Sequence, residues 1–542
     1  MKPPTLSALA ELTGGRLVAL GESGDPGDSS AAAGTVVAGA AIDARSVPSG
    51  GMFMAVPGTR AHGASYADQS AGASVLTDEA GLEVLRADGV TTDVLVVDDC
   101  RAWLGPVSAE INGHPSRSMT VIGVTGTSGK TTTSYMVERM LLDDHSVGLI
   151  GTTGTRINGT AVPTSLTTPE APTLQALFAR MRDEGVTHVV MEVSSHALVM
   201  GRVRGVDFDV AAFTNLSRDH LDFHPTMQDY FEAKSLLFTT PQDPGAGLPA
   251  AVVCVDDEWG RSLAGTLSAS GTSPVTVSTT GAHGQDAATW SVSSVEVGTD
   301  GLQHVTAVHA GQDVTFPVSL PGTFNVANAT VALACVAAAG GTGETEETVA
   351  AKLGDVRVPG RMQSVTVEAD GSRYPDDFLV LVDYAHKPGA VAAALSTLAD
   401  QIERAGHGGR VGVVLGAGGN RDHEKRPLMG SEAAKVADLV VVTDDNPRDE
   451  DPATIRSEVL AGARGELAAR GGNTGVDLRE IGDRADAIRA SVAWARRGDI
   501  VIVAGKGHET GQIVGDTVLE FDDVAVVAQA LRDRQDGQEP TR

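Results

Sequence analysis

The clearest chemistry in the sequence lies in a threonine- and glycine-rich loop that joins an apolar run to a helical pattern. Residues 120–141, TVIGVTGTSGKTTTSYMVERML, place Gly129-Lys130-Thr131 at this junction. Backbone N–H groups of such a loop can wrap a phosphate at the positive end of a helix. We therefore expect Lys130 to hold the terminal phosphates of a nucleotide and the Thr131 hydroxyl to bind Mg²⁺. The usual P-loop glycine is replaced by Val124, so the loop is of a different kind.

Polar side chains that could serve the same site follow the next two apolar runs. Glu192 in MEVSSHAL ends a predicted strand, at the edge where open α/β sheets bind ligands, and it is a natural Mg²⁺ ligand. His220 follows the next predicted strand and is a weaker candidate, because Mg²⁺ prefers oxygen ligands. Lys234 lies on the helical pattern after it, and its spacing alone favours a lysine that faces solvent.

These residues need parallel strands to position them, and the sequence predicts such strands. Short Val/Ile/Leu runs alternate with amphipathic helical patterns, which is typical of α/β folds with largely parallel sheets. Residues from about 276 to 316 instead alternate apolar and polar, as in an antiparallel meander. We predict three α/β domains: an N-terminal domain (1–117), a central parallel-sheet ATPase-like domain (118–358) and a C-terminal Rossmann-like domain (359–542).

Composition excludes several classes of partner. The 542 residues contain 41 Lys and Arg against 70 Asp and Glu, a net charge of −29. So acidic a chain is not expected to bind nucleic acid or an anionic membrane as its main partner. Its three distant cysteines form neither a disulfide framework nor a zinc spacing. Without a signal peptide or a long apolar run, we expect a cytoplasmic protein, and we expect a monomer.

Ten motifs in order make the sequence resemble the Mur ligases, the ATP-dependent amino-acid ligases of peptidoglycan synthesis. They are VTGTSGKTTT, MEVSSHAL, FTNLSRDHLDFH, YFEAKSLLF, GTFNVANATVAL, PGRMQ, VDYAHKPGA, GAGGNRDHEKRPLMG, TDDNPRDEDP and VAGKGHE. The resemblance covers nearly the whole chain and is greatest to the members that add the third residue of the stem peptide. It implies that the N-terminal domain binds the UDP-linked acceptor, the central domain ATP, and the C-terminal domain the amino acid.

The resemblance also implies the reaction. In the family, ATP phosphorylates a carboxylate of the acceptor, here the γ-carboxylate of D-Glu in UDP-MurNAc-L-Ala-D-Glu. The amine of the amino acid then attacks the acyl phosphate, and phosphate leaves. A carboxylate is a poor electrophile at neutral pH, so phosphorylation supplies the leaving group, while positioning and electrostatics carry most of the catalysis.

Site residues for ATP and metal follow from the same resemblance. It assigns ATP contacts to Gly126, Thr127, Ser128, Gly129, Lys130, Thr131, Thr132, Asn325, Arg361, Asp383 and His386. It assigns catalysis to Lys130, Glu192, His220 and Lys234, and Mg²⁺ binding to Thr131 with the last three of these. Lys234 matches a lysine that the family carbamylates, which would turn a cation into an oxygen ligand. The resemblance thus reverses the interpretation from spacing.

The acceptor site is assigned in the same way. The expected contacts to the UDP-muramoyl-peptide are Ile42, Ala44, Thr59, Arg60, Ala61, Thr167, Thr168, Ser194 and Arg202. Related enzymes often have serine where Ala44 stands, so one hydroxyl contact is expected to be missing. Leu166 and Met200 stand where some relatives have Asn and Gln, and contacts there are expected to differ.

The motif TDDNPRDEDP bears on which amino acid is added. Asp445-Asn446-Pro447-Arg448 matches relatives that use meso-2,6-diaminopimelate, whereas lysine-adding relatives typically lack the arginine. Arg448 can bind the distal carboxylate of diaminopimelate through paired N–H donors, which a lysine substrate would not engage. Asp445 or Asn446 can receive the distal ammonium. The other expected contacts are Arg421, on the carboxylate of the reacting end, and Gly505 and Glu509, at the distal end.

Other functions remain open at this point. A lysine-adding relative differs at Arg448, and another ligase of the superfamily would not be expected to carry both DNPR and GKGHE. A nucleotide-binding regulator without catalysis could keep the phosphate loop but would not need Glu192, His220 and Lys234 together. An unrelated P-loop kinase or GTPase is the weakest alternative because of Val124.

Overall fold

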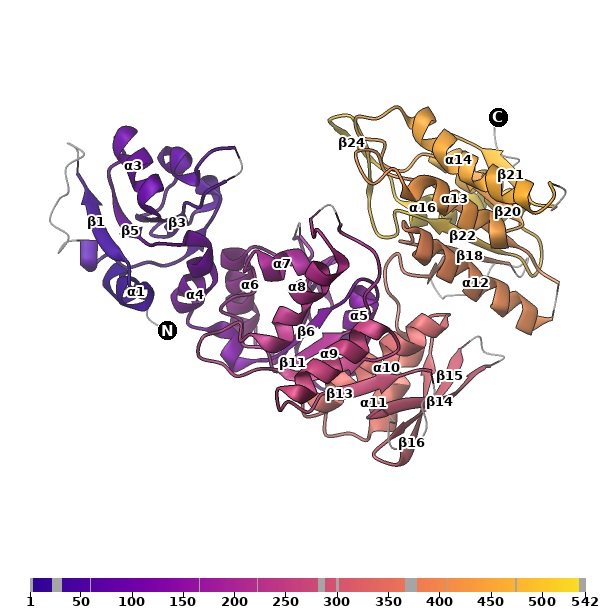
Figure 1. Cartoon of the computed structure of the whole chain (residues 1–542), viewed down its shortest axis with the longest axis horizontal. Coiled ribbons are helices and arrows are strands. Elements are labelled where there is room, and N and C mark those ends of the chain that lie inside the picture. The colour runs from indigo at the N-terminus through magenta and orange to yellow at the C-terminus, as the bar shows by residue number, and fades with distance from the viewer. Residues whose placement is uncertain are drawn as a thin grey trace. The chain divides into compact units, whose positions relative to one another are not determined.

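The computed structural model of the chain describes residues 3–21, 32–58, 60–164, 166–221, 223–280, 288–298, 302–365, 378–406, 408–472 and 475–535. The chain divides into two compact units (Figure 1). The first comprises Met1–Glu296, His304–Pro317 and Ala327–Gly354, and the second Val297–Gln303, Val318–Val326 and Asp355–Arg542. Within the described ranges, no helix is both long enough and apolar enough to cross a membrane.

The first sheet of the first unit has five strands in the order β1-β5-β4-β3-β2. Its strands are β1 (Arg16–Leu20), β2 (Ala40–Ala41), β3 (Met52–Met54), β4 (Ser74–Thr77) and β5 (Thr92–Val96), and its helices are α1 (Leu6–Thr13), α3 (Glu79–Ala87) and α4 (Cys100–Asn112). Only β1 pairs antiparallel, with β5. Apolar clusters pack on both faces, which makes this an α/β layer structure.

The second sheet of this unit has eleven strands in the order β16-β15-β14-β13-β12-β11-β6-β10-β7-β8-β9. Its strands are β6 (Thr120–Thr125), β7 (Val147–Gly151), β8 (Gly154–Ile157), β9 (Thr160–Val162), β10 (His188–Glu192), β11 (Val210–Phe213), β12 (Ala250–Cys254), β13 (Val275–Ser278), β14 (Trp290–Val297), β15 (Gln303–His309) and β16 (Gln312–Val318). The strand β6 lies between β10 and β11 and pairs parallel with both. Its continuous apolar sequence fits a strand that is covered on both faces.

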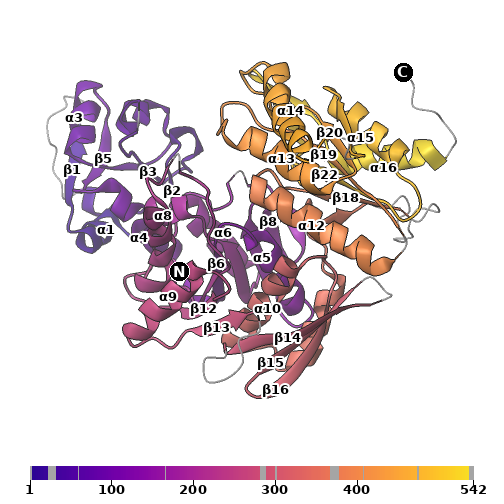
Figure 2. The ribbon, with the colours of Figure 1, turned by 45° about the vertical axis from the view of Figure 1, so that its right-hand side comes forward.

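Helices surround this sheet, as Figure 2 shows for α5, α6, α8 and α9. They are α5 (Lys130–Leu141), α6 (Ala171–Asp183), α7 (Ser195–Val199), α8 (Met227–Thr239), α9 (Glu258–Ala269), α10 (Thr323–Ala338) and α11 (Glu346–Ala351). The helix α8 begins with a full capping box, in which the Thr226 and Asp229 side chains each accept from the other's backbone N–H. This fixes the start of the helix that carries Lys234.

The stretch predicted as a meander forms the edge strands β14, β15 and β16, which neighbour one another in chain order. The strands β15 and β16 are joined by Ala310-Gly311, with φ of 50° and 79°, as in a two-residue hairpin turn. The first strand, β14, pairs parallel with β13, so the meander extends the parallel sheet. At the opposite edge, β7, β8 and β9 form antiparallel pairs that the sequence did not predict.

The second unit contains a six-stranded sheet in the order β17-β18-β22-β19-β20-β21, parallel except for β17. Its strands are β17 (Gln363–Ser364), β18 (Leu379–Asp383), β19 (Val411–Leu415), β20 (Leu439–Val442), β21 (Asp477–Glu480) and β22 (Ile500–Ala504), and a separate hairpin pairs β23 (Gly511–Val514) with β24 (Thr517–Glu520). The helices are α12 (Pro388–Ala405), α13 (Lys425–Val436), α14 (Pro452–Ala469), α15 (Arg484–Trp494) and α16 (Asp523–Gln535). The helices α12, α13 and α14 lie on one face of the six-stranded sheet, and α15 and α16 lie on the other (Figure 2). Their apolar side chains pack against those of the strands.

The predicted α/β class with parallel-rich sheets is therefore confirmed. The three large sheets fall within the three predicted stretches of chain, and most of the first two sheets belongs to one compact unit. The predicted boundaries at 117/118 and 358/359 stay predictions.

Candidate active site

The phosphate loop occupies residues 126–129, between the end of β6 at Thr125 and the start of α5 at Lys130. Gly126 has φ 148° and Gly129 has φ 88°, in the region that favours glycine. A Cβ on Gly126 would lie 1.9 Å from Thr214 Oγ1. Both conformation and space therefore require glycine there, and the loop leads directly into the N-terminus of a helix.

The end of the neighbouring strand β11 holds the loop in shape. Thr214 Oγ1 donates to Ser128 O at 2.7 Å, and Asn215 Nδ2 donates to the same oxygen at 3.1 Å. In return, Asn215 accepts from two loop amides, at Oδ1 from Ser128 N at 3.0 Å and at its carbonyl from Thr127 N at 2.9 Å. Sequence reasoning did not single out Thr214 and Asn215. The available signal was their place in FTNLS, directly after a strand that ends at the same sheet edge.

Two lysines converge on the loop. Lys130 Nζ donates to Gly126 O at 2.8 Å and to Thr127 O at 3.1 Å. Lys234 Nζ also donates to Gly126 O at 2.8 Å and lies 4.6 Å from the centre of the Tyr230 ring. Lys234 is only 1% exposed, so the interpretation from spacing, a lysine facing solvent, is wrong.

Tyr230 joins this cluster through its hydroxyl, 3.2 Å from Thr127 Oγ1. Burial raises the pKa of Tyr230 above its ordinary value, so the phenol stays neutral at physiological pH. A neutral ring next to Lys234 Nζ attracts the ammonium without adding charge to the loop.

Glu192 ends β10 in register with Val124 of β6, two residues before Gly126. It is 1% exposed, and its two oxygens accept from Thr152, Oε1 from the backbone N–H at 2.8 Å and Oε2 from the hydroxyl at 2.9 Å. Thr152 Oγ1 also lies 3.1 Å from Thr167 Oγ1. The β7–β8 turn therefore orients a buried carboxylate beside the phosphate loop.

His220 lies near this cluster. Its backbone has φ 52°, its side chain is 46% exposed, and its Nε2 lies 3.2 Å from Asp219 Oδ2. Its ring centre is 5.9 Å from that of Tyr230 and 5.1 Å from that of His196. The described residues thus bring Lys130, Glu192, His220 and Lys234 to one edge of the sheet, with Thr131 on the first turn of α5.

The donor set suits Mg²⁺ delivered with a nucleotide. Across the ranges that the structure describes, no three His, Cys, Asp or Glu side chains group closely enough to hold a metal by themselves. Protein sites for Mg²⁺ usually supply one or two carboxylates, with phosphates and water as the other ligands. The Glu192 carboxylate and the Thr131 hydroxyl fit that pattern.

The residues expected to hold the muramoyl peptide cluster at the carboxyl end of β10. Thr168 Oγ1 donates to Glu192 O at 2.9 Å and accepts from Ser194 N at 3.2 Å. Arg202 Nη1 donates to Thr168 O at 3.2 Å, and Arg202 Nε lies 2.8 Å from Glu170 Oε1. This network connects the expected acceptor contacts to the backbone of Glu192.

The expected uridine contacts lie on two loops of the first sheet. Ala44 opens a short 3₁₀ helix and is 5% exposed, with Ile42 partly buried just before it. Arg60 and Ala61 are exposed in the turn closed by the Pro57–His62 bridge. Thr59 lies outside the described residues.

In the second unit, three of the expected ATP contacts gather around Tyr384. The Arg361 guanidinium lies 4.2 Å from the centre of the Tyr384 ring. Asp383 ends β18 and accepts from Met362 N at 2.7 Å and from Ala385 N at 2.8 Å, while burial raises its pKa. His386 Nδ1 donates to Tyr384 O at 2.7 Å, and burial lowers the pKa of His386 to about 4.

The fourth, Asn325, lies on the first turn of α10. It is 2% exposed, and its Nδ2 donates to Pro321 O at 2.7 Å. Its side chain is therefore held by the chain segment that precedes the helix.

The residues expected to select the amino acid lie together where β20 and β22 end, and we call this group of side chains the amino-acid pocket. Asn446 Nδ2 donates to Glu509 Oε2 at 3.0 Å, and Lys506 Nζ donates to Asn446 Oδ1 at 2.8 Å. Asp445 Oδ1 lies 3.4 Å from Lys506 Nζ. Gly505 has φ 126°, and a Cβ there would lie 3.0 Å from Asp445 Oδ2. Burial first, and then repulsion from Asp445, raise the pKa of Glu509.

Arg448 connects this pocket to the loop that carries Arg421. Its backbone, with φ 53°, donates from N to Ile513 O in β23 at 3.0 Å. Its Nη1 donates to Gly419 O at 2.9 Å, two residues before the exposed Arg421. The carbonyl of Pro447 lies so close to Gly419 that a Cβ there would be 1.9 Å from it. The two loops that carry the expected arginine contacts therefore pack against each other.

Sequence reasoning missed Lys506 and Arg484 in this region. Lys506 is fully buried and burial lowers its pKa, although its motif, GKGHE, had been noted for its neighbours. Arg484, also fully buried, donates to both oxygens of Asp523 at 2.7 Å and to Ala504 O at 3.1 Å. No local pattern marks Arg484, because its partner lies on another helix.

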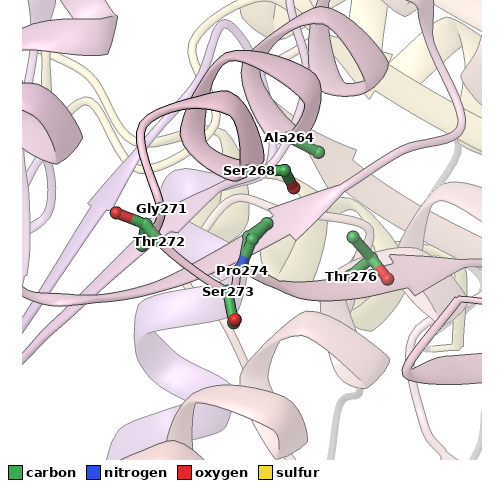
Figure 3. Close-up of a pocket in the computed structure, with 7 residues that line it drawn as sticks. All are labelled: Ala264, Ser268, Gly271, Thr272, Ser273, Pro274 and Thr276. Carbon is green, nitrogen blue, oxygen red and sulfur yellow. The ribbon is translucent and has the colours of Figure 1, made fainter.

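A surface hollow of the first unit lies away from this chemistry (Figure 3). It is lined by Ala264, Ser268, Gly271, Thr272, Ser273, Pro274 and Thr276, at the end of α9 and the start of β13. The strands β13, β12, β11 and β6 are parallel, so the start of β13 lies at the sheet edge opposite the phosphate loop.

Two family models match the chain, the Mur ligase middle domain over residues 124–336 and the Mur ligase, glutamate ligase domain over residues 360–507. A relative from Corynebacterium glutamicum, named UDP-N-acetylmuramoyl-L-alanyl-D-glutamate--2,6-diaminopimelate ligase, is 53% identical over 510 residues. The match covers 93% of this chain and 93% of the relative.

Solved structures are similar over most of the chain. A structure titled with the same ligase name is 29% identical, with a TM-score of 0.61 over 92% of this chain and 96% of its own. The MurF ligase from Thermotoga maritima, solved in complex with ADP, is 16% identical, with a TM-score of 0.57 over 92% and 97% of the two chains. At that identity, the second likeness is one of fold alone.

Proposed function

The chain belongs to the Mur ligase family, and from that premise we propose that it adds meso-2,6-diaminopimelate to the γ-carboxylate of D-Glu in UDP-MurNAc-L-Ala-D-Glu. The reaction uses ATP, passes through an acyl phosphate of the acceptor and releases ADP and phosphate. The product is a tripeptide precursor of peptidoglycan. In this proposal residues 1–117 bind the UDP part, 118–358 the ATP phosphates, and 359–542 the amino acid.

The phosphate loop supports the ATP-dependent step. Its backbone N–H groups lie at the N-terminus of α5, the end of a helix that attracts anions. Lys130 Nζ donates to two loop carbonyls, at 2.8 Å and 3.1 Å. A terminal phosphate bound in the loop would attract the ammonium away from these carbonyls. Mg²⁺, held by Glu192 and Thr131 together with the phosphates, would supply charge neutralisation at the transferred group. Lys130 would then orient that group towards the acceptor carboxylate.

The observation that carries the choice of amino acid is the pocket at the ends of β20 and β22. It combines one arginine, Arg448, with two carboxylates, those of Asp445 and Glu509. The distal end of diaminopimelate carries one carboxylate and one ammonium, so it is complementary to this set. A lysine substrate has no distal carboxylate, so it would offer Arg448 no charged partner.

The direct test measures phosphate release by the purified protein with Mg²⁺-ATP and UDP-MurNAc-L-Ala-D-Glu. Meso-diaminopimelate and L-lysine are supplied in parallel, and mass spectrometry identifies the product. We expect phosphate and a tripeptide product with diaminopimelate only. Turnover with lysine alone would keep the ligase and overturn the role of Arg448. Absence of turnover with both amino acids, in a protein that binds ATP, would favour another acceptor or a regulator.

A further inference from the structure

One lysine that the proposed function does not use lies at the centre of the amino-acid pocket. Lys506 is fully buried, and its Nζ lies 2.8 Å from Asn446 Oδ1, 2.8 Å from Gly511 O and 3.4 Å from Asp445 Oδ1. An ammonium has three N–H donors, and three protein oxygens surround this one. The ammonium therefore faces the protein and is not directed at a ligand.

These contacts fix the orientation of the Asn446 amide. Asn446 Oδ1 accepts from Lys506 Nζ at 2.8 Å and from the backbone N–H of Ile513 at 3.0 Å. Because both groups can only donate, the oxygen of the amide must face them, and its NH₂ must face the other way. That NH₂ donates to Glu509 Oε2 at 3.0 Å.

The same ammonium also ties down the hairpin that holds Arg448. Gly511, whose carbonyl accepts from Lys506, is the first residue of β23. Two residues later, Ile513 O accepts from Arg448 N at 3.0 Å. Lys506 therefore contacts both sides of the pocket, the side of the carboxylates and the side of the arginine.

We infer that Lys506 is a positioning residue that sets which side of the pocket receives the distal ammonium and which receives the distal carboxylate. It does so by holding the Asn446 amide oxygen, which turns the amide NH₂ onto Glu509 and keeps the Glu509 carboxylate in the pocket. The inference rests on the proposed function, because it assigns a role within the diaminopimelate site. It predicts that Lys506 governs recognition of the distal stereocentre, where ammonium and carboxylate exchange places between the meso and LL isomers.

The test is Lys506→Met, which keeps the length of the side chain and removes the charge, beside Lys435→Met as a matched control on the exposed face of α13. We expect KM for meso-diaminopimelate to rise about tenfold to hundredfold, the effect of losing a charged hydrogen bond. KM for ATP and for the UDP-linked acceptor should stay within about twofold, and the preference for the meso over the LL isomer should fall. A lysine with a purely structural role would instead lower kcat and leave these ratios unchanged.

A second variant keeps the inference testable if Lys506→Met does not fold. Asn446→Asp retains an oxygen for Lys506 but removes the NH₂ that holds Glu509, so it should also raise KM for diaminopimelate. Adding Glu509→Gln to Lys506→Met should cost little more than Glu509→Gln alone, because both act through one carboxylate. Unchanged KM and unchanged isomer preference in a folded Lys506→Met or Asn446→Asp protein would overturn the inference. Wild-type protein that releases no phosphate with diaminopimelate would instead overturn the proposed function itself.

Discussion

Gly126 and Gly505 occupy equivalent places in their two sheets, and the two sites that we propose beside them require different chemistry. Each directly follows a strand that lies between parallel neighbours, β6 in one sheet and β22 in the other. Each has a positive φ, 148° and 126°. After Gly126 the chain enters the helix α5, whereas after Gly505 it turns towards the hairpin of β23 and β24. A glycine with positive φ directly after a central strand therefore precedes two different kinds of proposed site.

The first lysine after each glycine shows how the two sites differ. Lys130 is partly exposed at the helix N-terminus, and its Nζ rests on loop carbonyls. Lys506 is fully buried, and its Nζ donates hydrogen bonds to Asn446 Oδ1 and Gly511 O. A phosphate site can thus be built mainly from backbone N–H groups and one partly exposed cation. The proposed amino-acid site instead combines several side chains of both charges with a buried cation that orients them.

The strongest test of this contrast is Lys130→Ala. The variant should fold normally and lose at least about a thousandfold in turnover, because the loop would lose the cation proposed to orient and neutralise the transferred phosphate. Phosphate release measures the loss, circular dichroism and thermal unfolding check the fold, and Lys435→Ala serves as the control for a surface lysine. Full activity in a folded Lys130→Ala protein would contradict the ATP-site assignment.

On α5, the helix that follows the phosphate loop, Glu138 is expected to make the stability of the fold depend on pH. This carboxyl is 2% exposed, Arg156 Nε lies 3.4 Å from Oε1, and burial raises its pKa from 4.5 to about 7. A raised pKa in the folded state means that the stabilising contribution is complete below about pH 4.5 and is lost as the pH rises through about 7. Glu138→Gln should therefore be more stable than wild type above pH 7, by up to about 3 kcal/mol.

Urea unfolding of the Glu138→Gln protein at pH 5 and pH 8 measures this difference. The two proteins should be similar in stability at pH 5 and differ at pH 8. The control, Glu347→Gln, changes an exposed carboxyl on α11 and should leave the unfolding free energy within about 0.5 kcal/mol at both pH values. Equal stability of Glu138→Gln and wild type at pH 8 would show that the folded protein carries Glu138 in its charged form at no cost.

Arg448→Ala tests the side-chain character of the second site. We expect KM for diaminopimelate to rise about tenfold to hundredfold, because the variant lacks the guanidinium that would bind the distal carboxylate and that contacts Gly419 O. KM for ATP should change much less, because the phosphate loop is held by other residues. Steady-state kinetics with each substrate varied in turn measure the two constants. Equal increases in both would count against a selective role for Arg448.

The contrast also explains what could be predicted from the sequence. The strands β6, β10 and β11 were predicted because buried parallel strands read as continuous apolar runs. The strand β7 was missed although it is also a buried apolar run, and the shorter strands β8 and β9 beyond it, which alternate or are exposed, gave no such run. Lys130 and Glu192 were placed on the phosphate-loop edge from local order alone, since each directly follows or ends a strand of the same sheet.

Side chains that act through distant partners were harder to place. Lys234 was expected in solvent from its spacing, yet its Nζ donates to Gly126 O, 108 residues away in the chain. Arg484 and Lys506 are oriented by Asp523 and Asn446, which lie on other elements. Helical period and strand pattern describe neighbours within one element. They contain no information on which buried polar groups will meet across elements, and only the resemblance to the family placed Lys234 in the site.

The smallest effect is expected at Gly505, and it separates backbone strain from side-chain contact. Gly505→Ala puts a side chain on a residue whose φ is 126°, and its Cβ would lie 3.0 Å from Asp445 Oδ2. Gly471→Ala in the same unit imposes a similar φ, 93°, where a Cβ would meet nothing within 4 Å. Strain alone should destabilise both variants by about 1 kcal/mol. Because Asp445 Oδ2 ends a side chain that can shift, Gly505→Ala should also raise KM for diaminopimelate by about fivefold, a change on the scale of one displaced contact. Equal kinetics in the two variants would mean that the Asp445 carboxylate does not need its present position, and would reduce the contrast between the two glycines to their backbone conformation.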